Sequence, residues 1–260
     1  MTATDWIVAM RRSHVELFAT VATLGADKLG AQSGAAEWTV AQVLSHLGSA
    51  AELGILTLQA AIDGGPPADR DALAPPIWDR WNAMSPSEMA SNSDDYGNRV
   101  VALFESLDDD ALENLRIDIG FMPAPIDVAT LASFRLSELA LHGWDVHVAF
   151  DPSATVAGHT VPLLLTQLPM MGGFFARPIG RSATVVLETT DPSATFTLEL
   201  TDQGGQMREG AAVTDDRVQL PGEALMRLTA GRLAPDHTPA SVTVDGAVTL
   251  DDLRKVFPGY

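Results

Sequence analysis

The stretch RLSELALHGWDV, residues 135–146, places a carboxylate and an imidazole four positions apart, at Glu138 and His142. Residues i and i+4 lie on the same face of a helix, with Cβ atoms roughly 5–6 Å apart. Apolar residues at helical spacing surround the pair, so we expect Glu138 to enter the interior of a helical bundle, where an unpaired charge is costly. A cation bound jointly with His142 would neutralise the carboxylate, and a shared proton is the alternative.

A second stretch, EWTVAQVLSHL at residues 37–47, offers a third ligand, His46. Thr39 and Gln42 have the spacing of a capping box, which predicts a helix that begins at about Val40. His46 lies at the edge of the apolar stripe of this helix. Two histidines and one carboxylate, with one position left open, are the ligand set of catalytic zinc sites and of other divalent centres. The alternative for each histidine is a hydrogen-bonded core residue.

The composition of the chain limits the kinds of protein it can be. Among its 260 residues, 46% are hydrophobic, which is enough for a large core, and the formal net charge is −18. Such a surface repels nucleic-acid phosphates and anionic membranes, so we expect neither as a partner. The absence of cysteine excludes disulfides and thiolate metal sites, and it fits a cytoplasmic protein. We see no signal-peptide pattern, and the most apolar stretch, 161–175, is too short to span a membrane.

Helical patterns fill the first half of the chain. Long helices are expected at 4–30, 40–62, 86–107 and 126–150, with a short helix at 77–84 and an irregular segment at 116–125. Four long helices with one long crossover predict a four-helix bundle, a fold that builds metal sites from facing helices.

The second half has a mixed pattern. An apolar helix is expected at 161–175, and residues 184–189 and 195–200 alternate with period two around a hairpin turn at Asp191-Pro192. A strand at 218–220, a helix at 221–231, a strand at 241–245 and a last helix capped by Thr249 follow. We therefore expect two domains of class α plus α/β: a four-helix bundle at 1–153 and a small α+β domain at 154–260.

Two motifs carry a resemblance to a known family. They are Trp38-Thr-Val-x-x-Val-Leu-x-His46-Leu and Glu138-x-x-x-His142-Gly-Trp-Asp145-Val. Together they resemble the two signatures of the mycothiol-dependent maleylpyruvate isomerase family, and the helix order and domain division are similar as well. The resemblance implies a DinB-like metal-binding bundle, a small sterol-carrier-like C-terminal domain, and His46, Glu138 and His142 as zinc ligands. The residues alone suggest the same three ligands.

The resemblance also implies an arginine from the C-terminal domain that faces the metal. Arg232, in the stretch LTAGR at 228–232, matches that place best, and Arg227 is the second choice. The alternative is a solvated arginine at a helix end. Asp145, three residues after His142, is either the partner of a ligating imidazole or an exposed acid.

The function implied by the resemblance is a metal-dependent enzyme that activates the thiolate of mycothiol for attack on a small, anionic electrophile. Isomerisation of a cis-enedione such as maleylpyruvate and mycothiol S-transfer begin with the same attack, so both stay open. Zinc is the expected divalent metal, with iron, nickel and manganese as alternatives. Two further hypotheses are a non-catalytic small-molecule-binding protein that uses residues 161–175, and a hydrolase that uses zinc-bound water. The oligomeric state stays open.

Overall fold

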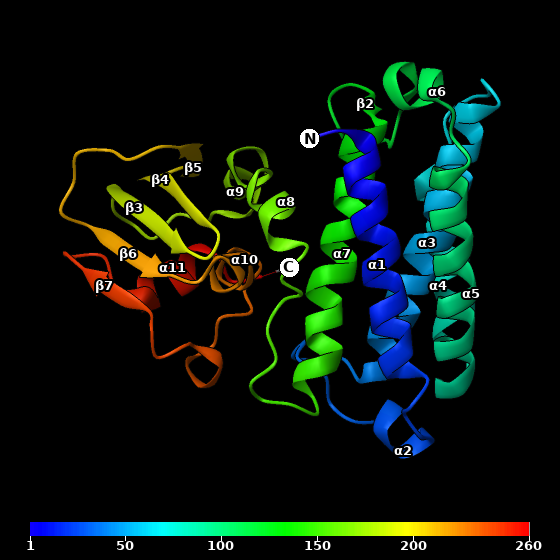
Figure 1. Cartoon of the computed structure of the whole chain (residues 1–260), viewed down its shortest axis with the longest axis horizontal. Helices are drawn as coiled ribbons and strands as arrows, with labels where there is room; N and C mark the ends of the chain where they lie inside the picture. The colour runs from blue at the N-terminus through cyan, green and yellow to red at the C-terminus, as the bar shows by residue number, and fades with distance from the viewer. Residues whose placement is uncertain (260) are drawn as a thin grey trace. The chain divides into compact units, whose positions relative to one another are not determined.

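The computed structural model describes residues 1–259 as two compact units that divide after Asp151 (Figure 1). The boundary expected from the sequence lies after Ser153. The first unit is helical, and the second contains a sheet with short helices. This arrangement confirms the expected fold class.

Four long helices form the first unit: α1 (Ala3–Val21), α3 (Val40–Ile62), α5 (Pro86–Glu105) and α7 (Val128–Val148). Helix α1 packs against α7, and α3 packs against α5 and α7 (Figure 1). Three shorter helices join them: α2 (Ala26–Leu29), α4 (Arg70–Asn82) and α6 (Asp109–Asn114). The core is formed by buried apolar residues on the inner faces of the long helices, among them Met10, Leu44, Leu47, Phe104, Leu136 and Leu139.

Side-chain caps fix where the two site-bearing helices begin. Before α3, the Thr39 hydroxyl accepts a hydrogen bond from Gln42 N at 3.3 Å, and Thr39 N donates to Gln42 Oε1 at 2.8 Å. Before α7, Asp127 Oδ1 accepts from Thr130 N at 2.8 Å. These caps satisfy amide groups that have no partner inside the helix.

Three expectations for the first unit need correction. Helix α1 ends at Val21 rather than near residue 30, and α2 is a separate helix; Thr23 Oγ1 donates to Thr20 O at 2.7 Å, a local bond that competes with helix continuation. Helix α4 begins at Arg70 rather than at 77 because Asp69 caps it. The segment expected to be irregular contains β1 (Arg116–Ile117), which pairs antiparallel with β2 (Ile126–Asp127).

The second unit contains a five-stranded sheet of order β5-β4-β3-β6-β7. Its strands are β3 (Ala183–Thr190), β4 (Ser193–Thr201), β5 (Gly204–Glu209), β6 (Arg217–Leu220) and β7 (Thr243–Asp245). Within this sheet β3 and β6 pair in parallel, the other neighbouring strands pair antiparallel, and the expected β3–β4 hairpin is present. The helices of this unit are α8 (Val161–Leu165), α9 (Leu168–Phe175), η1 (Pro235–His237), α10 (Gly222–Thr229) and α11 (Leu250–Val256). The result is a small α+β domain.

One expectation for the second unit was wrong, and one strand was not predicted. The apolar stretch at 161–175 is two short helices, α8 and α9, and not one. Pro169, which lacks an amide N–H, lies in the first turn of α9, where the amides have no helical partner. The pattern also did not predict β5, because only Met207 in that strand is buried.

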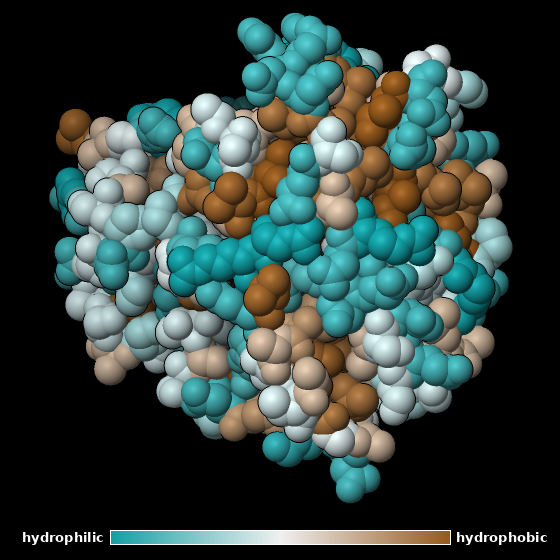
Figure 2. Space-filling view, turned by 45° about the vertical axis from the view of Figure 1, so that its right-hand side comes forward, coloured by the Kyte–Doolittle hydropathy of each residue, from teal (hydrophilic) through white to brown (hydrophobic). Residues whose placement is uncertain are grey.

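The surface mixes polar and apolar residues. Figure 2 shows hydrophilic residues interspersed with hydrophobic ones over the visible face. Among the helices of the described chain, none has the length and apolar character needed to cross a membrane.

Candidate metal centre

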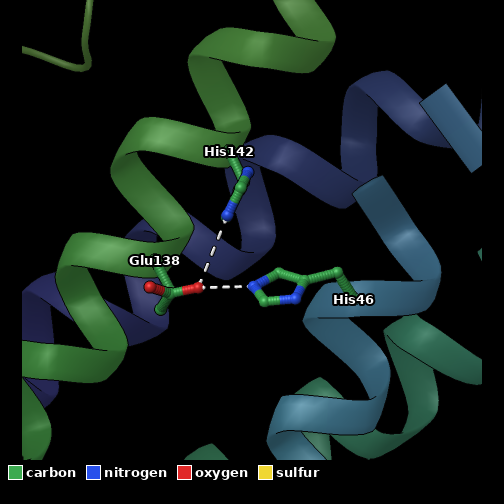
Figure 3. Close-up of side chains that lie close together, drawn as sticks. All are labelled: His46, Glu138 and His142. Carbon is green, nitrogen blue, oxygen red and sulfur yellow. Dashed lines mark hydrogen bonds and ion pairs between the residues drawn. The ribbon is translucent and has the colours of Figure 1, made fainter. Parts of the chain in front are cut away.

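Helices α7 and α3 bring the three expected ligands together. Glu138 and His142 lie one turn apart on α7, and His46 comes from α3 (Figure 3). Glu138 Oε2 is 2.7 Å from His46 Nε2 and 3.5 Å from His142 Nε2. The three ligand atoms all lie within 4.8 Å of one another. Residues that are 92 positions apart in the chain, His46 and Glu138, thus form one cluster.

The cluster is open on one side. The His46 side chain is 34% exposed and that of Glu138 is 28% exposed, whereas His142 is 5% exposed. The carboxylate therefore lies at the edge of the bundle interior, less buried than the sequence suggested. A ligand reaching the cluster from solvent would meet His46 and Glu138 first.

Glu138 is held in its ionised form. Burial raises the pKa of its carboxyl, but hydrogen bonds and charge interactions with His142 and His46 outweigh this and hold the pKa well below its ordinary value. A divalent cation binds deprotonated ligands. An ionised carboxylate beside two imidazoles meets this requirement.

Asp145 fixes the orientation of His142. Its Oδ2 lies 2.8 Å from His142 Nδ1, and its side chain is fully buried. This contact engages Nδ1 of the imidazole, which leaves Nε2 to face Glu138. Asp145 is therefore not an exposed acid but a buried partner of the His142 imidazole, and ligation of a metal by His142 stays a prediction. Metal-binding histidines usually have such a partner.

The loop before α3 covers the two imidazoles with an aromatic ring. The Trp38 ring centroid is 5.1 Å from that of His46 and 6.1 Å from that of His142. The same loop is joined to α7 by a hydrogen bond from Gly34 N to Asp145 O, of 2.8 Å. The motif alone did not indicate this position of Trp38, although its place directly before the capping box was a usable signal.

Arg135 is a second residue whose role the sequence did not reveal. It lies one turn before Glu138, is buried, and donates from Nη1 to Leu47 O at 3.0 Å. Within residues 1–259, its Nε has no hydrogen-bond partner. Burial lowers its pKa to about 10, against the opposing influence of Glu138, so the guanidinium stays charged at neutral pH. It links the two ligand-bearing helices next to His46.

The residues present suit a divalent cation. Two imidazole nitrogens and one carboxylate oxygen converge, and the buried Asp145 orients one imidazole. This donor set matches three-ligand zinc sites, which keep one position for a substrate atom or water.

Comparison with known proteins places the chain in a family. The profile of the mycothiol maleylpyruvate isomerase N-terminal domain matches residues 10–147, which is more than half of the chain. The chain belongs to this family. The match includes both motifs and all three candidate ligands.

Solved structures of the family's namesake share the fold along almost the whole chain. A crystal structure of the mycothiol-dependent maleylpyruvate isomerase has 13% sequence identity and a TM-score of 0.65, covering 94% of this chain and 93% of that one. A histidine-to-alanine mutant of such an enzyme has 12% identity and a TM-score of 0.63, with 89% and 90% covered. A search of curated proteins finds no match. At this identity the structures show that the fold is shared.

The two arginines expected to complete the family's site lie in the second unit. Arg227 on α10 is buried; its Nη2 and Nε bond to Glu223 at 2.7 Å, and its Nη1 donates to His237 O. Arg232 lies beyond α10, and its Nη1 donates to Ala230 O at 3.0 Å. Arg227 thus bonds to Glu223 and to His237 within its own unit, and ligand binding by Arg232 or Arg227 stays a prediction.

Proposed function

We propose that this family member is a metal-dependent enzyme that uses mycothiol as a thiol cosubstrate for attack on a small electrophile. The observation that carries the proposal is the convergence of His46, Glu138 and His142 within 4.8 Å, with Asp145 holding His142. We further propose zinc as the metal, because its preferred ligands are those present, and the cytoplasm as the location, because the chain has no cysteine.

Each residue of the centre has a distinct task in this proposal. A bound divalent cation lowers the pKa of a thiol that coordinates it, and so supplies thiolate at neutral pH. The chain provides the charge and the orientation: Glu138 contributes the negative charge, and Asp145 keeps His142 Nε2 directed at the centre. The Trp38 ring packs beside both imidazoles, with centroids 5.1 Å from that of His46 and 6.1 Å from that of His142.

The proposed reaction starts with addition of the thiolate sulfur to one carbon of a cis double bond conjugated to a carbonyl. A carbon–sulfur bond forms, and the π electrons move to the carbonyl oxygen as an enolate. Rotation about the resulting single bond, followed by return of the electrons and departure of the thiolate, gives the trans isomer and regenerates the thiolate. With an electrophile whose adduct does not expel the sulfur, the enolate takes up a proton from water, the conjugate is released, and the enzyme is an S-transferase.

An arginine is expected to bind the negative charge of the substrate. A guanidinium pairs well with a carboxylate or enolate oxygen, and on a chain of net charge −18 an anionic substrate needs such a local cation. We propose Arg232 for this task, with Arg227 as the alternative.

The test is an assay of the zinc-loaded protein with maleylpyruvate, with and without mycothiol, in which products are identified by mass spectrometry. We expect turnover only when both zinc and mycothiol are present, and loss of turnover in His46→Ala with an unchanged circular dichroism spectrum. Hydrolysis without added thiol, or full activity of His46→Ala, would contradict the proposal.

A further inference from the structure

Trp38 has an exposed indole that uses none of its hydrogen-bonding capacity. Its residue is 36% exposed, and among the described residues the hydrogen bonds of Trp38 all use its backbone N–H and carbonyl. The buried Trp81 differs, because its Nε1 donates to Glu52 Oε2 at 2.7 Å. Tryptophan N–H groups usually find a partner when they are withdrawn from water. The Trp38 donor is therefore available to a ligand.

Hydrogen bonds hold the backbone at Trp38 in place, and its ring packs beside the His46 and His142 rings. Trp38 O accepts hydrogen bonds from Ser33 N at 3.0 Å, Ser33 Oγ at 2.7 Å and Gln32 Nε2 at 2.9 Å. Trp38 N donates to Ala35 O at 3.0 Å. None of these bonds uses the indole, so the loop can keep its conformation when the side chain is changed. Because the residue is already held in place, its side chain loses little conformational entropy when a ligand packs on the ring.

The exposed indole lies beside the open side of the metal centre. Its ring is closer to His46 than to His142, and His46 and Glu138 are the two partly exposed ligands. A molecule whose sulfur reaches this side of the centre brings its adjoining groups next to Trp38.

We propose that Trp38 is the binding platform for a polyhydroxylated ring of the thiol cosubstrate. The inference rests on the proposed function, because mycothiol joins its cysteine to a sugar ring and an inositol ring. Such rings have C–H faces, which suit the apolar indole surface, and hydroxyls at the rim, which can accept from the indole N–H. The contact needs no charge on the ligand, which suits a protein of net charge −18.

The experiment compares two thiols on the zinc-saturated protein by titration calorimetry. Mycothiol carries the rings, whereas N-acetylcysteinamide has the same thiol without them. We expect Trp38→Ala to weaken mycothiol binding about tenfold and to leave N-acetylcysteinamide binding within about twofold, since tryptophan is among the residues whose truncation weakens binding most. Trp38→Phe, which keeps a ring but loses the N–H, should lie between wild type and Trp38→Ala.

Trp78→Ala is the matched control. Trp78 is an exposed tryptophan on α4, and its substitution should leave the affinities for both thiols unchanged. Zinc content is measured for every variant. Equal weakening of both thiols by Trp38→Ala would overturn the inference, because Trp38 would then act through the metal ligands. Unchanged mycothiol affinity would overturn it as well, with the proposed function intact. Wild-type protein that binds neither thiol would instead contradict the proposed function itself.

Discussion

At the scale of single residues, Asp145 orients one of the three candidate ligands. We predict that Asp145→Asn weakens zinc affinity by about 10-fold to 100-fold, because the amide no longer enforces the tautomer that directs His142 Nε2 at Glu138. Competition with a chromophoric chelator measures the affinity. Asp95→Asn is the control, since Asp95 is an exposed acid on α5. Equal zinc affinity of Asp145→Asn and wild type would show that the contact does not orient the ligand.

His14 makes the first unit sensitive to acid. Burial lowers the pKa of His14 from 6.5 to about 4. The nearby charges of Arg135 and Arg11 also lower this pKa, whereas Asp94, whose Oδ1 lies 3.0 Å from His14 Nε2, raises it. Because the folded state disfavours the protonated imidazole, the contribution of His14 to the free energy of unfolding is fully present above pH 6.5 and is lost as the pH falls toward 4. Between pH 7.5 and pH 5, we expect this contribution to fall by about 2 kcal/mol.

Urea unfolding of the metal-free protein at both pH values measures this loss, with His14→Gln as the comparison. The variant should lose less stability than wild type over the same interval, by about 2 kcal/mol. The same pH dependence in both proteins would contradict the assignment to His14.

The convergence of the three candidate ligands was predictable from the sequence, whereas the positions of their neighbours were not. Glu138 and His142 share a helix face by their spacing, and the capping box at Thr39 placed His46 on a second helix. The contact of Arg135 with Leu47 O joins residues 88 positions apart, and no local pattern encodes it. The place of Trp38 over the imidazoles likewise depends on how its loop packs on α7.

At the scale of secondary structure, the loop before α3 is packed on α7 through a glycine. A Cβ added at Gly34 would lie 2.6 Å from Val148 Cγ1 and 3.0 Å from Asp145 Cα. We predict that Gly34→Ala lowers the free energy of unfolding by about 1–3 kcal/mol, because the α7 backbone cannot move aside. Gly143→Ala on α7 is the control; its Cβ meets nothing within 4 Å, and helix propensity favours it by about 1 kcal/mol. Similar stabilities of the two variants in urea would contradict this packing.

The long helices were well predicted because their signals are local. The caps at Thr39 and Ser85 fix the first residues of α3 and α5, and apolar spacing supplies the rest. The misses have physical reasons: the prolines inside α4 hid its beginning, and β5 is too exposed to show an alternating pattern. Pairing of β1 with β2 is short and non-local, so the sequence gives little sign of it.

At the scale of the whole molecule, metal binding and folding of the first unit should be coupled. All three ligands lie before Asp151, and an unfolded chain would not hold them together. We predict that zinc at 100 times its dissociation constant stabilises this unit by about 2.7 kcal/mol, and that a chelator reverses the effect. Calorimetric unfolding with zinc and with EDTA measures it. Identical transitions under both conditions would argue against the coupling.

The metal content per chain tests the proposed centre most directly. Elemental analysis would compare wild type with His46→Ala, and with His147→Ala, which removes a partly buried histidine on α7 that bonds to Thr20. We predict close to one zinc per chain in wild type and in His147→Ala, and almost none in His46→Ala. Wild-type protein that holds no metal after incubation with excess zinc, or His46→Ala that holds as much as wild type, would contradict the account.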